Sequence, residues 1–378
     1  MRAWERVMKK SLGIYIHIPF CLQKCRYCDF CSLAGKDRDY MSAYADELCR
    51  RISEFAPKTE SYVVDTVYFG GGTPSLLPAE DIRKIMNALA LYDVSPDAEV
   101  TLECNPATAD LEYFKAVRNL GVNRLSIGLQ SAHDRELALL GRVHSVDDFV
   151  TCFEDARRAG FDNISADLMY GIPDQTLESF AKSIDFLVSL KPEHISSYGL
   201  TVEEGTYFHK HESELDLADS DTQAEMYCMM EELLARHGYG KYEISNFSRA
   251  GRQSKHNLRY WKRLDYVGFG VAAHSCFDGI RFGNSRDISA FLNGEDITEE
   301  KYVLEKNDIK SEYVMLGLRL TEGIDMDDYR SLFGEELLER HPVIYRYVGD
   351  GFMRFDGNRV CFTQKGMLVS NSILSDIL

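Results

Sequence analysis

The chain has 378 residues, of which 45% are hydrophobic and 27% are charged, the composition of an ordinary soluble protein. Its net charge of -17 at pH 7 argues against a nucleic-acid partner, because phosphate binding needs a clustered excess of lysine and arginine. The sequence shows no signal peptide and no apolar run long enough to span a bilayer, so we expect a cytoplasmic protein with at most peripheral membrane contact.

Ten cysteines in a chain without secretory signals indicate reduced thiols or metal ligands rather than a disulfide framework. Only the first four are clustered in the sequence. The other six are expected to be scattered structural thiols: Cys49, Cys104, Cys152, Cys228, Cys276 and Cys361.

The first residues lead into a short strand. Residues 1–12 combine basic side chains with Trp4 and Met8, which predicts a short amphipathic surface helix. A strand over Ile14–Ile18 follows, and Pro19 ends it because proline cannot donate a backbone hydrogen bond to a sheet. The cysteine cluster therefore begins directly after the first predicted strand.

Three cysteines follow this strand with the spacing C-x3-C-x2-C: Cys21, Cys25 and Cys28. Three thiolates on one loop can hold three irons of a 4Fe-4S cluster and leave the fourth iron open to a small molecule. The alternative is a zinc site that also uses Cys31, although four ligands so close in sequence would be cramped. Cys31 could also be a spare thiol, a cluster-proximal residue or a redox-labile passenger, and we favour the passenger.

Beyond the cysteine loop, strands and helices alternate with short connections. Strict alternation predicts a parallel sheet, since parallel neighbours need a crossover and a helix supplies it. Six such units, counting the first strand, predict an open, partial (β/α)6 TIM-like barrel of the α/β class. The further strands are expected at Asp65–Phe69, Glu99–Glu103, Arg124–Gln130, Asn163–Leu168 and His194–Tyr198. The helices are expected at Tyr40–Phe55, Ala79–Leu91, Leu111–Asn119, Val146–Ala159 and Phe180–Leu190.

The predicted domain organisation has a lead-in over residues 1–12, a barrel over 13–240, an associated segment over 241–305 and a small module over 306–378. The last part of the barrel region is acidic, with a helix expected at Asp219–Arg236, and it lacks the alternation of strands and helices. In the last module, helices at Ser311–Leu318 and Asp325–Leu332 precede a hairpin within Val348–Phe362. Helices followed by a hairpin predict a winged-helix-like α+β module.

Polar and glycine-rich residues stand at the C-terminal ends of the predicted strands. The run from Gly70 to Thr73 could be a tight turn, but three glycines also let the backbone approach a ligand closely. Single polar residues at strand ends are more often capping or solvated groups than ligands. Because barrel active sites lie at this rim, four such residues together favour a binding site. They are Glu103, Gln130, Arg142 and Asp167.

A second cluster with functional character is the segment from His256 to Trp261, HNLRYW. Its aromatic residues could be packing residues of the core and His256 a satisfied core histidine. An imidazole beside aromatic rings would also suit a flat, metal-bearing ligand such as haem, with the histidine as axial ligand.

Taken together, these motifs resemble the radical S-adenosylmethionine superfamily, and within it the group of the anaerobic coproporphyrinogen-III oxidase and related haem chaperones. The resemblance covers nearly the whole chain and is closest to the chaperones. It is carried by the segments YIHIPFCLQKCRYC, YFGGGTPS, LECNP, RLSIGLQS, LGR, DLMYGIP and KHNLRYW. It implies a 4Fe-4S cluster on Cys21, Cys25 and Cys28, whose fourth iron is chelated by S-adenosylmethionine. One electron then cleaves this cofactor to a 5'-deoxyadenosyl radical.

The resemblance also assigns binding residues by position. Those that match S-adenosylmethionine contacts are Tyr15, Tyr27, Gly71, Gly72, Thr73, Glu103, Gln130, Arg142 and Asp167. Those that match a haem-binding motif are His256, Asn257, Tyr260 and Trp261.

Two departures from the oxidase bear on function. The oxidase has a fourth cysteine two positions after the third, where this chain has Phe30. It also has a longer N-terminal extension, whereas only residues 1–12 precede the first strand here. The HNxxYW motif instead resembles the chaperones, so the chaperone interpretation is favoured.

This interpretation implies a chaperone that binds haem as cargo and transfers it to apo-haemoproteins, with the cluster and S-adenosylmethionine acting in dimerisation or transfer. The expected partners are haem, apo-haemoprotein acceptors, an electron donor and a second copy of the chain. The alternative is an oxygen-independent coproporphyrinogen III dehydrogenase, in which the radical removes a propionate β-hydrogen before carbon dioxide is lost to give protoporphyrinogen IX. A third hypothesis is a radical enzyme acting on another tetrapyrrole. The sequence leaves open whether S-adenosylmethionine is cleaved productively.

Overall fold

The computed structural model of the protein describes residues 9–378. It divides into two compact units, each built from several stretches of chain. The first unit comprises the residues up to Gly128, Gly141–Ile164 and Leu264–Val303. The second comprises Leu129–Leu140, Ser165–Arg263 and Leu304–Leu378.

Four of the predicted strands run parallel in the first unit, and the first of them in the chain is β1 (Lys10–Ile18). Most of the predicted N-terminal helix lies outside the described residues, but the prediction of a helix was wrong for residues 10–12. Residues 10–12 belong to β1, because they pair in register with residues 62–64 of the neighbouring strand. The other parallel strands are β4 (Tyr62–Gly71), β5 (Val94–Cys104) and β6 (Arg124–Gln130), whose last two residues belong to the second unit.

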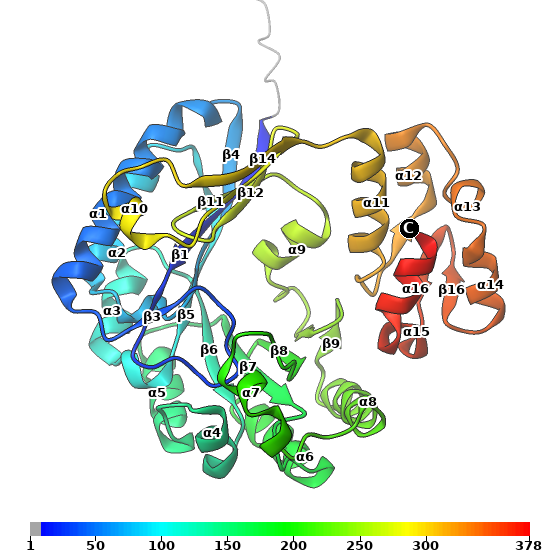
Figure 1. Ribbon diagram of the computed structural model, residues 1–378, viewed down its shortest axis with the longest axis horizontal. Coiled ribbons are helices and arrows are strands. Elements are labelled where there is room, and N and C mark those ends of the chain that lie inside the picture. The colour runs from blue at the N-terminus through cyan, green and yellow to red at the C-terminus, as the bar shows by residue number, and fades with distance from the viewer. Residues whose placement is uncertain (1–8) are drawn as a thin grey trace, which may run out of the picture. The chain divides into compact units, whose positions relative to one another are not determined.

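Helices connect these strands, and their starts follow from the sequence. Asp37, Asp110 and Ser145 each cap a helix by accepting a backbone hydrogen bond from its first turn. Figure 1 shows α1, α2 and α3 lying along one face of the strands. The β-then-α alternation expected for this part of the chain is confirmed. The helices are α1 (Arg38–Phe55), α2 (Ala79–Leu89), α3 (Leu111–Asn119) and α5 (Val146–Arg158).

Besides the short pair β2 and β3, four strands between residues 266 and 303 of the first unit were not predicted. One of them, β11 (Tyr266–Phe269), pairs in parallel with β1 on the side opposite β4, and the other three continue antiparallel from it. The remaining elements of this unit are β12 (His274–Phe277), β13 (Ile280–Asn284), α10 (Ile288–Leu292), β14 (Thr298–Val303) and the short pair β2 (Phe20–Cys21) and β3 (Leu33–Ala34).

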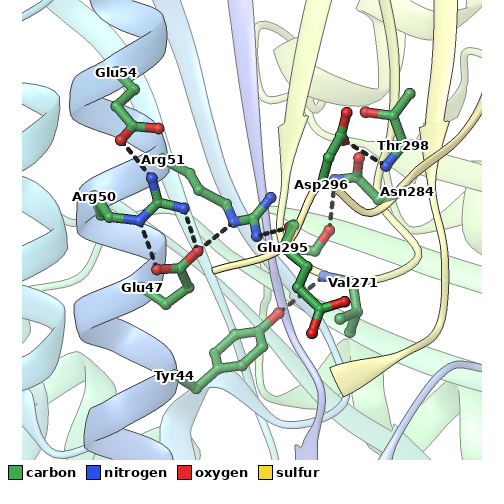
Figure 2. Close-up of polar contacts among 11 residues, drawn as sticks. Tyr44, Glu47, Arg50, Arg51, Glu54, Val271, Asn284, Glu295, Asp296 and Thr298 are labelled. Atoms are coloured by element: carbon green, nitrogen blue, oxygen red, sulfur yellow. Dashed lines mark hydrogen bonds and ion pairs between the residues drawn. The ribbon is translucent and has the colours of Figure 1, made fainter. Parts of the chain in front are cut away.

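Side chains of α1 hold this added segment in place (Figure 2). The buried Tyr44 hydroxyl accepts a hydrogen bond from the Val271 backbone N–H at 3.1 Å and donates one to the His17 carbonyl at 3.0 Å. Arg51 donates to the Glu295 carbonyl at 2.6 Å. The two Tyr44 contacts connect the end of β1, which directly precedes the cysteine loop, to the residues that follow β11.

The second unit contains a parallel pair of strands, β7 (Ile164–Tyr170) and β8 (His194–Gly199). Strand β10 (Asn246–Ser248) pairs antiparallel with β8, and β9 (Gly240–Lys241) pairs antiparallel with β10. Ile164 of β7 is counted with the first unit. The helices of this part are α4 (Asp134–Leu140), α6 (Leu177–Ser189), α7 (Tyr207–Lys210), α8 (Ser220–Arg236) and α9 (Lys255–Trp261).

The C-terminal part of the second unit has its own hydrophobic core, which includes Val314, Tyr329 and Val360. Its helices surround a three-stranded antiparallel sheet in the order β15-β17-β16, so the expected hairpin is confirmed. The elements are α11 (Lys306–Gly317), β15 (Ile324–Asp325), α12 (Met326–Phe333), α13 (Leu337–Arg340), α14 (Val343–Gly349), β16 (Met353–Asp356), β17 (Arg359–Phe362), α15 (Gln364–Leu368) and α16 (Ser370–Ile377).

Candidate functional site

The three predicted cluster ligands lie in one loop of the first unit. Cys21 ends β2, while Cys25 and Cys28 form a turn in which the Cys28 N–H donates to the Cys25 carbonyl at 3.2 Å. All three are half-buried free thiols. Burial raises the pKa of the Cys21 and Cys28 thiols, and the nearby Cys25 raises both further. Cys25 therefore lies close enough to Cys21 and Cys28 to act on both electrostatically.

This donor set fits an iron–sulfur cluster, since soft thiolates are the ligands that such clusters take. A bound cluster would displace the thiol protons, because only the thiolate is a metal ligand. Among residues 9–378, no group of three or more histidine, cysteine or acidic side chains is placed to hold a metal ion, so the thiols would have to turn toward one another to bind either a cluster or zinc.

The glycine loop after β4 is attached to the backbone that precedes the cysteines. Gly72 N–H donates to the Ile18 carbonyl at 2.8 Å, and Thr73 N–H donates to the Phe20 carbonyl at 2.7 Å. A Cβ on Gly72 would lie 2.7 Å from the Phe20 carbonyl oxygen, so only glycine fits this approach. The Thr73 hydroxyl also lies 3.6 Å from the Cys21 sulfur. The two predicted motifs thus form one structural element.

Glu103, on β5, faces the same loop. One carboxylate oxygen accepts a hydrogen bond from the Tyr68 hydroxyl at 2.7 Å, and the other accepts one from the Gly71 N–H at 3.1 Å. Gly71 has a φ of 111°, in the region that favours glycine. A carboxylate fixed beside the glycine loop is suited to binding an ammonium group.

Arg142 brings a positive charge to the cysteine loop. Its Nη1 lies 3.7 Å from the Cys25 sulfur, and its Nη2 donates to the Gly128 carbonyl at 3.2 Å. A guanidinium in this position can bind a carboxylate. Tyr27 lies half-buried in the cysteine loop.

Sequence reasoning missed His17, which lies two residues after Tyr15 on the same face of β1. The histidine is 5% exposed; its Nδ1 lies 3.0 Å from the Tyr15 hydroxyl and its Nε2 lies 2.9 Å from the Cys31 carbonyl. Burial lowers the pKa of His17, which favours the neutral ring. The sequence could have pointed to His17, because a histidine within an apolar strand directly before a metal-ligand motif is unusual.

Cys31 has a structural contact through its backbone. The His17 ring holds its carbonyl, while burial raises the pKa of its half-buried thiol. Its interpretation as a passenger thiol stays a prediction.

Gln130 and Asp167 belong to the second unit. Gln130 is 4% exposed, and its side-chain oxygen accepts a hydrogen bond from the Tyr198 hydroxyl at 3.0 Å. Its φ of 70° is rare for a residue other than glycine, and such strained backbone is concentrated at functional sites. Asp167 is half-buried on β7, where it pairs in register with Ser196.

The HNxxYW segment forms helix α9 in the second unit. His256 and Tyr260, four residues apart, lie on the same face of the helix, with His256 Nε2 2.8 Å from the Tyr260 hydroxyl. His256 is only 1% exposed. Iron ligation through Nε2 would require Tyr260 to give up this hydrogen bond. Asn257 and Trp261 are half-buried, and the Arg319 guanidinium lies 6.0 Å from the Trp261 ring centre.

The structure therefore brings together most of the predicted S-adenosylmethionine contacts with the cysteines within the first unit. The residues collected in the first unit are Tyr15, Cys21, Cys25, Tyr27, Cys28, Gly71, Gly72, Thr73, Glu103 and Arg142.

Within residues 9–378, the structure contains no helix long and apolar enough to cross a membrane.

Comparison with known proteins gives two family matches. Residues 15–187 match the model of the radical SAM superfamily, and residues 304–369 match that of the HemN C-terminal domain. The chain is 36% identical to a protein of Bacillus subtilis (strain 168) named heme chaperone HemW, over 96% of this chain and 98% of that protein. It is 33% identical to the protein of the same name from Escherichia coli (strain K12), over 96% of this chain and 97% of that one.

Among solved structures, the chain resembles coproporphyrinogen III oxidase (HemN) from Escherichia coli, described as a radical SAM enzyme. The TM-score is 0.86 at 22% identity, and the match covers 99% of this chain and 91% of that one. This likeness confirms the predicted fold class, a TIM-like α/β barrel with a small C-terminal domain.

Proposed function

Because the chain belongs to the radical S-adenosylmethionine superfamily and, within it, to the family of the HemW proteins, we propose that it is a haem chaperone. It would bind haem and transfer it to apo-haemoproteins. The main support is the likeness to heme chaperone HemW proteins over almost the entire chain. Phe30 adds to it, since this exposed side chain stands where the oxidase has its fourth cysteine.

In this proposal, Cys21, Cys25 and Cys28 hold a 4Fe-4S cluster. The cluster supplies an electron and an open iron for S-adenosylmethionine when both are bound. Glu103 would bind the amino group of that cofactor beside Gly71, and Arg142 would bind its carboxylate, as the charges of these groups favour. The remaining contacts would come from Tyr15, Tyr27, Gly72, Thr73, Gln130 and Asp167.

Haem would bind at helix α9. His256 would supply the iron ligand once the Tyr260 hydroxyl releases its Nε2. Trp261 is half-buried, so part of its indole is open to contact with a flat porphyrin. Asn257 would complete the site.

We further propose a cytoplasmic location, apo-haemoproteins as acceptors, an electron donor for the cluster and a homodimer. The cluster and S-adenosylmethionine would serve dimerisation or transfer.

One observation favours a second candidate, an oxygen-independent coproporphyrinogen III dehydrogenase. The fold matches that of the HemN oxidase over 99% of the chain, and the first unit retains a carboxylate and a guanidinium beside the cysteine loop. In that case the S-adenosylmethionine site would support substrate oxidation rather than haem delivery.

A paired assay separates the two. Anaerobically reconstituted protein is offered haem in one reaction, and coproporphyrinogen with S-adenosylmethionine and a reductant in another. The chaperone proposal expects stoichiometric haem uptake and no protoporphyrinogen. Protoporphyrinogen formed over many turnovers would refute it and establish the dehydrogenase.

A further inference from the structure

Helix α9 begins at a buried cap. Ser254 is fully buried and its hydroxyl accepts a hydrogen bond from the Asn257 N–H at 3.3 Å. The backbone N–H of Ser254 in turn donates to the hydroxyl of Tyr242 at 3.3 Å. Because the first N–H groups of a helix have no partner within it, contacts at the cap fix where the helix starts. Tyr242 therefore holds the residue two positions before His256.

The Tyr242 hydroxyl continues into the strands of the second unit. It lies 2.8 Å from His194 Nε2, and His194 Nδ1 lies 2.8 Å from the Ser165 hydroxyl. His194 on β8 and Ser165 on β7 are direct neighbours in the parallel pairing. Tyr242 is 9% exposed, and the other two are 1% exposed. These hydrogen bonds join buried groups, where such bonds are stronger than in water and their loss is costly.

One arrangement of hydrogens satisfies the three contacts together. The Ser254 N–H points to the Tyr242 oxygen, so the Tyr242 hydrogen can be donated to His194 Nε2. In this arrangement His194 carries a hydrogen on Nδ1 and donates it to the Ser165 oxygen. His194 and Tyr242 thus connect a strand hydroxyl to the cap of α9.

The same strands carry predicted S-adenosylmethionine contacts. Asp167 is two residues after Ser165, and residues two apart on a strand lie on the same face. Tyr198 follows His194 by four residues on β8 and donates to Gln130. The strands that position Asp167 and Gln130 therefore also position His194.

We propose that Tyr242 and His194 are positioning residues for haem binding: they fix the start of α9 on β7 and β8, and so set the placement of His256. This rests on the proposed function, because α9 is the proposed haem site. Neither residue contacts haem in this proposal. Their effect is transmitted through the cap at Ser254.

The test uses Tyr242→Phe, which keeps the ring and removes only the hydroxyl. The variant loses the hydrogen bonds to Ser254 and His194, and the one from the Ser254 N–H acts on α9. In the reconstituted full chain, the dissociation constant for haem should rise by up to about fivefold, the factor that corresponds to one hydrogen bond of average strength. The absorption maximum of bound haem should also shift, since His256 would be placed differently. His194→Gln, which keeps one donor and one acceptor, should lose less affinity than His194→Leu.

The matched control is Tyr239→Phe. Tyr239 is 1% exposed and its hydroxyl donates to the Pro192 carbonyl at 2.7 Å, so this variant also removes a buried hydrogen bond. A purely structural role of Tyr242 predicts the same haem affinity and spectrum for both variants, and that result would overturn the proposal.

A second measurement separates this inference from the proposed function. If the unmodified protein takes up no haem, the chaperone proposal fails, but hydrogen exchange still reports on α9. The amides of Asn257 and Leu258, which donate to Ser254, should exchange about fivefold faster in Tyr242→Phe than in Tyr239→Phe. Equal exchange would refute the positioning role.

Discussion

Replacing Gly72 with alanine should separate the glycine loop from the cysteine loop. The added Cβ would lie 2.7 Å from the Phe20 carbonyl oxygen and 2.9 Å from that of Ile18, and both are backbone atoms that cannot rotate away. The loop must move, which breaks the hydrogen bonds from Gly72 to Ile18 and from Thr73 to Phe20. At about 0.5–1.5 kcal/mol each, their loss should lower the free energy of unfolding by about 2 kcal/mol.

The assay is urea unfolding of the reduced protein, together with the iron retained per chain after anaerobic reconstitution. Gly240→Ala is the control, because its Cβ would lie 3.9 Å from the nearest obstacle, the Ser248 carbonyl oxygen, and its φ is not positive. We expect Gly72→Ala to unfold at lower urea and to retain less iron than the control. Equal unfolding midpoints and equal iron content would show that the two loops are not held together as described.

Three further predictions follow from the other buried groups. Glu103→Gln should weaken S-adenosylmethionine binding at least about tenfold by removing a charge-assisted bond, with an unchanged cluster spectrum, measured by titration. Glu243 is fully buried, and burial raises its pKa above the ordinary 4.5. The stability that Glu243 contributes is therefore fully present below its ordinary pKa of 4.5 and is lost as pH rises through the raised pKa. In urea unfolding, the stability of Glu243→Gln relative to the unmodified protein should therefore increase as pH rises above 4.5. His256→Ala should weaken haem uptake in a spectroscopic titration and leave the cluster spectrum intact.

Each of these has a contrary outcome. Unchanged cofactor affinity in Glu103→Gln would leave Glu103 as a purely structural acceptor for Tyr68 and Gly71. A stability difference for Glu243→Gln that does not grow with pH would show that Glu243 titrates normally. Unchanged haem uptake in His256→Ala would remove this residue from the haem site.

Elements defined by local signals could be predicted well from the sequence. Helix α3 and strand β6 have the predicted bounds, since Asp110 caps the helix and the strand is a short run between turns. The approach of Glu103 to Gly71 was also foreseeable, because the ends of neighbouring parallel strands meet at one edge of a sheet.

Other features depend on pairings between distant parts of the chain. Strand β11 pairs with β1 although more than two hundred residues separate them, and no local pattern specifies such a partner. Residues 10–12 look amphipathic in isolation, yet pairing with β4 makes them a strand. The hydrogen bond between His256 and Tyr260, by contrast, could have been inferred from their spacing of four on a helix.

The most direct test of the chaperone proposal is haem transfer. The reconstituted chain is loaded with one equivalent of haem and mixed with an apo-haemoprotein, whose absorption spectrum reports its own haem content. We predict that the acceptor gains haem in proportion to the loaded chain, and that the same chain carrying His256→Ala delivers less. An acceptor that stays empty beside a fully loaded chain would contradict the proposal.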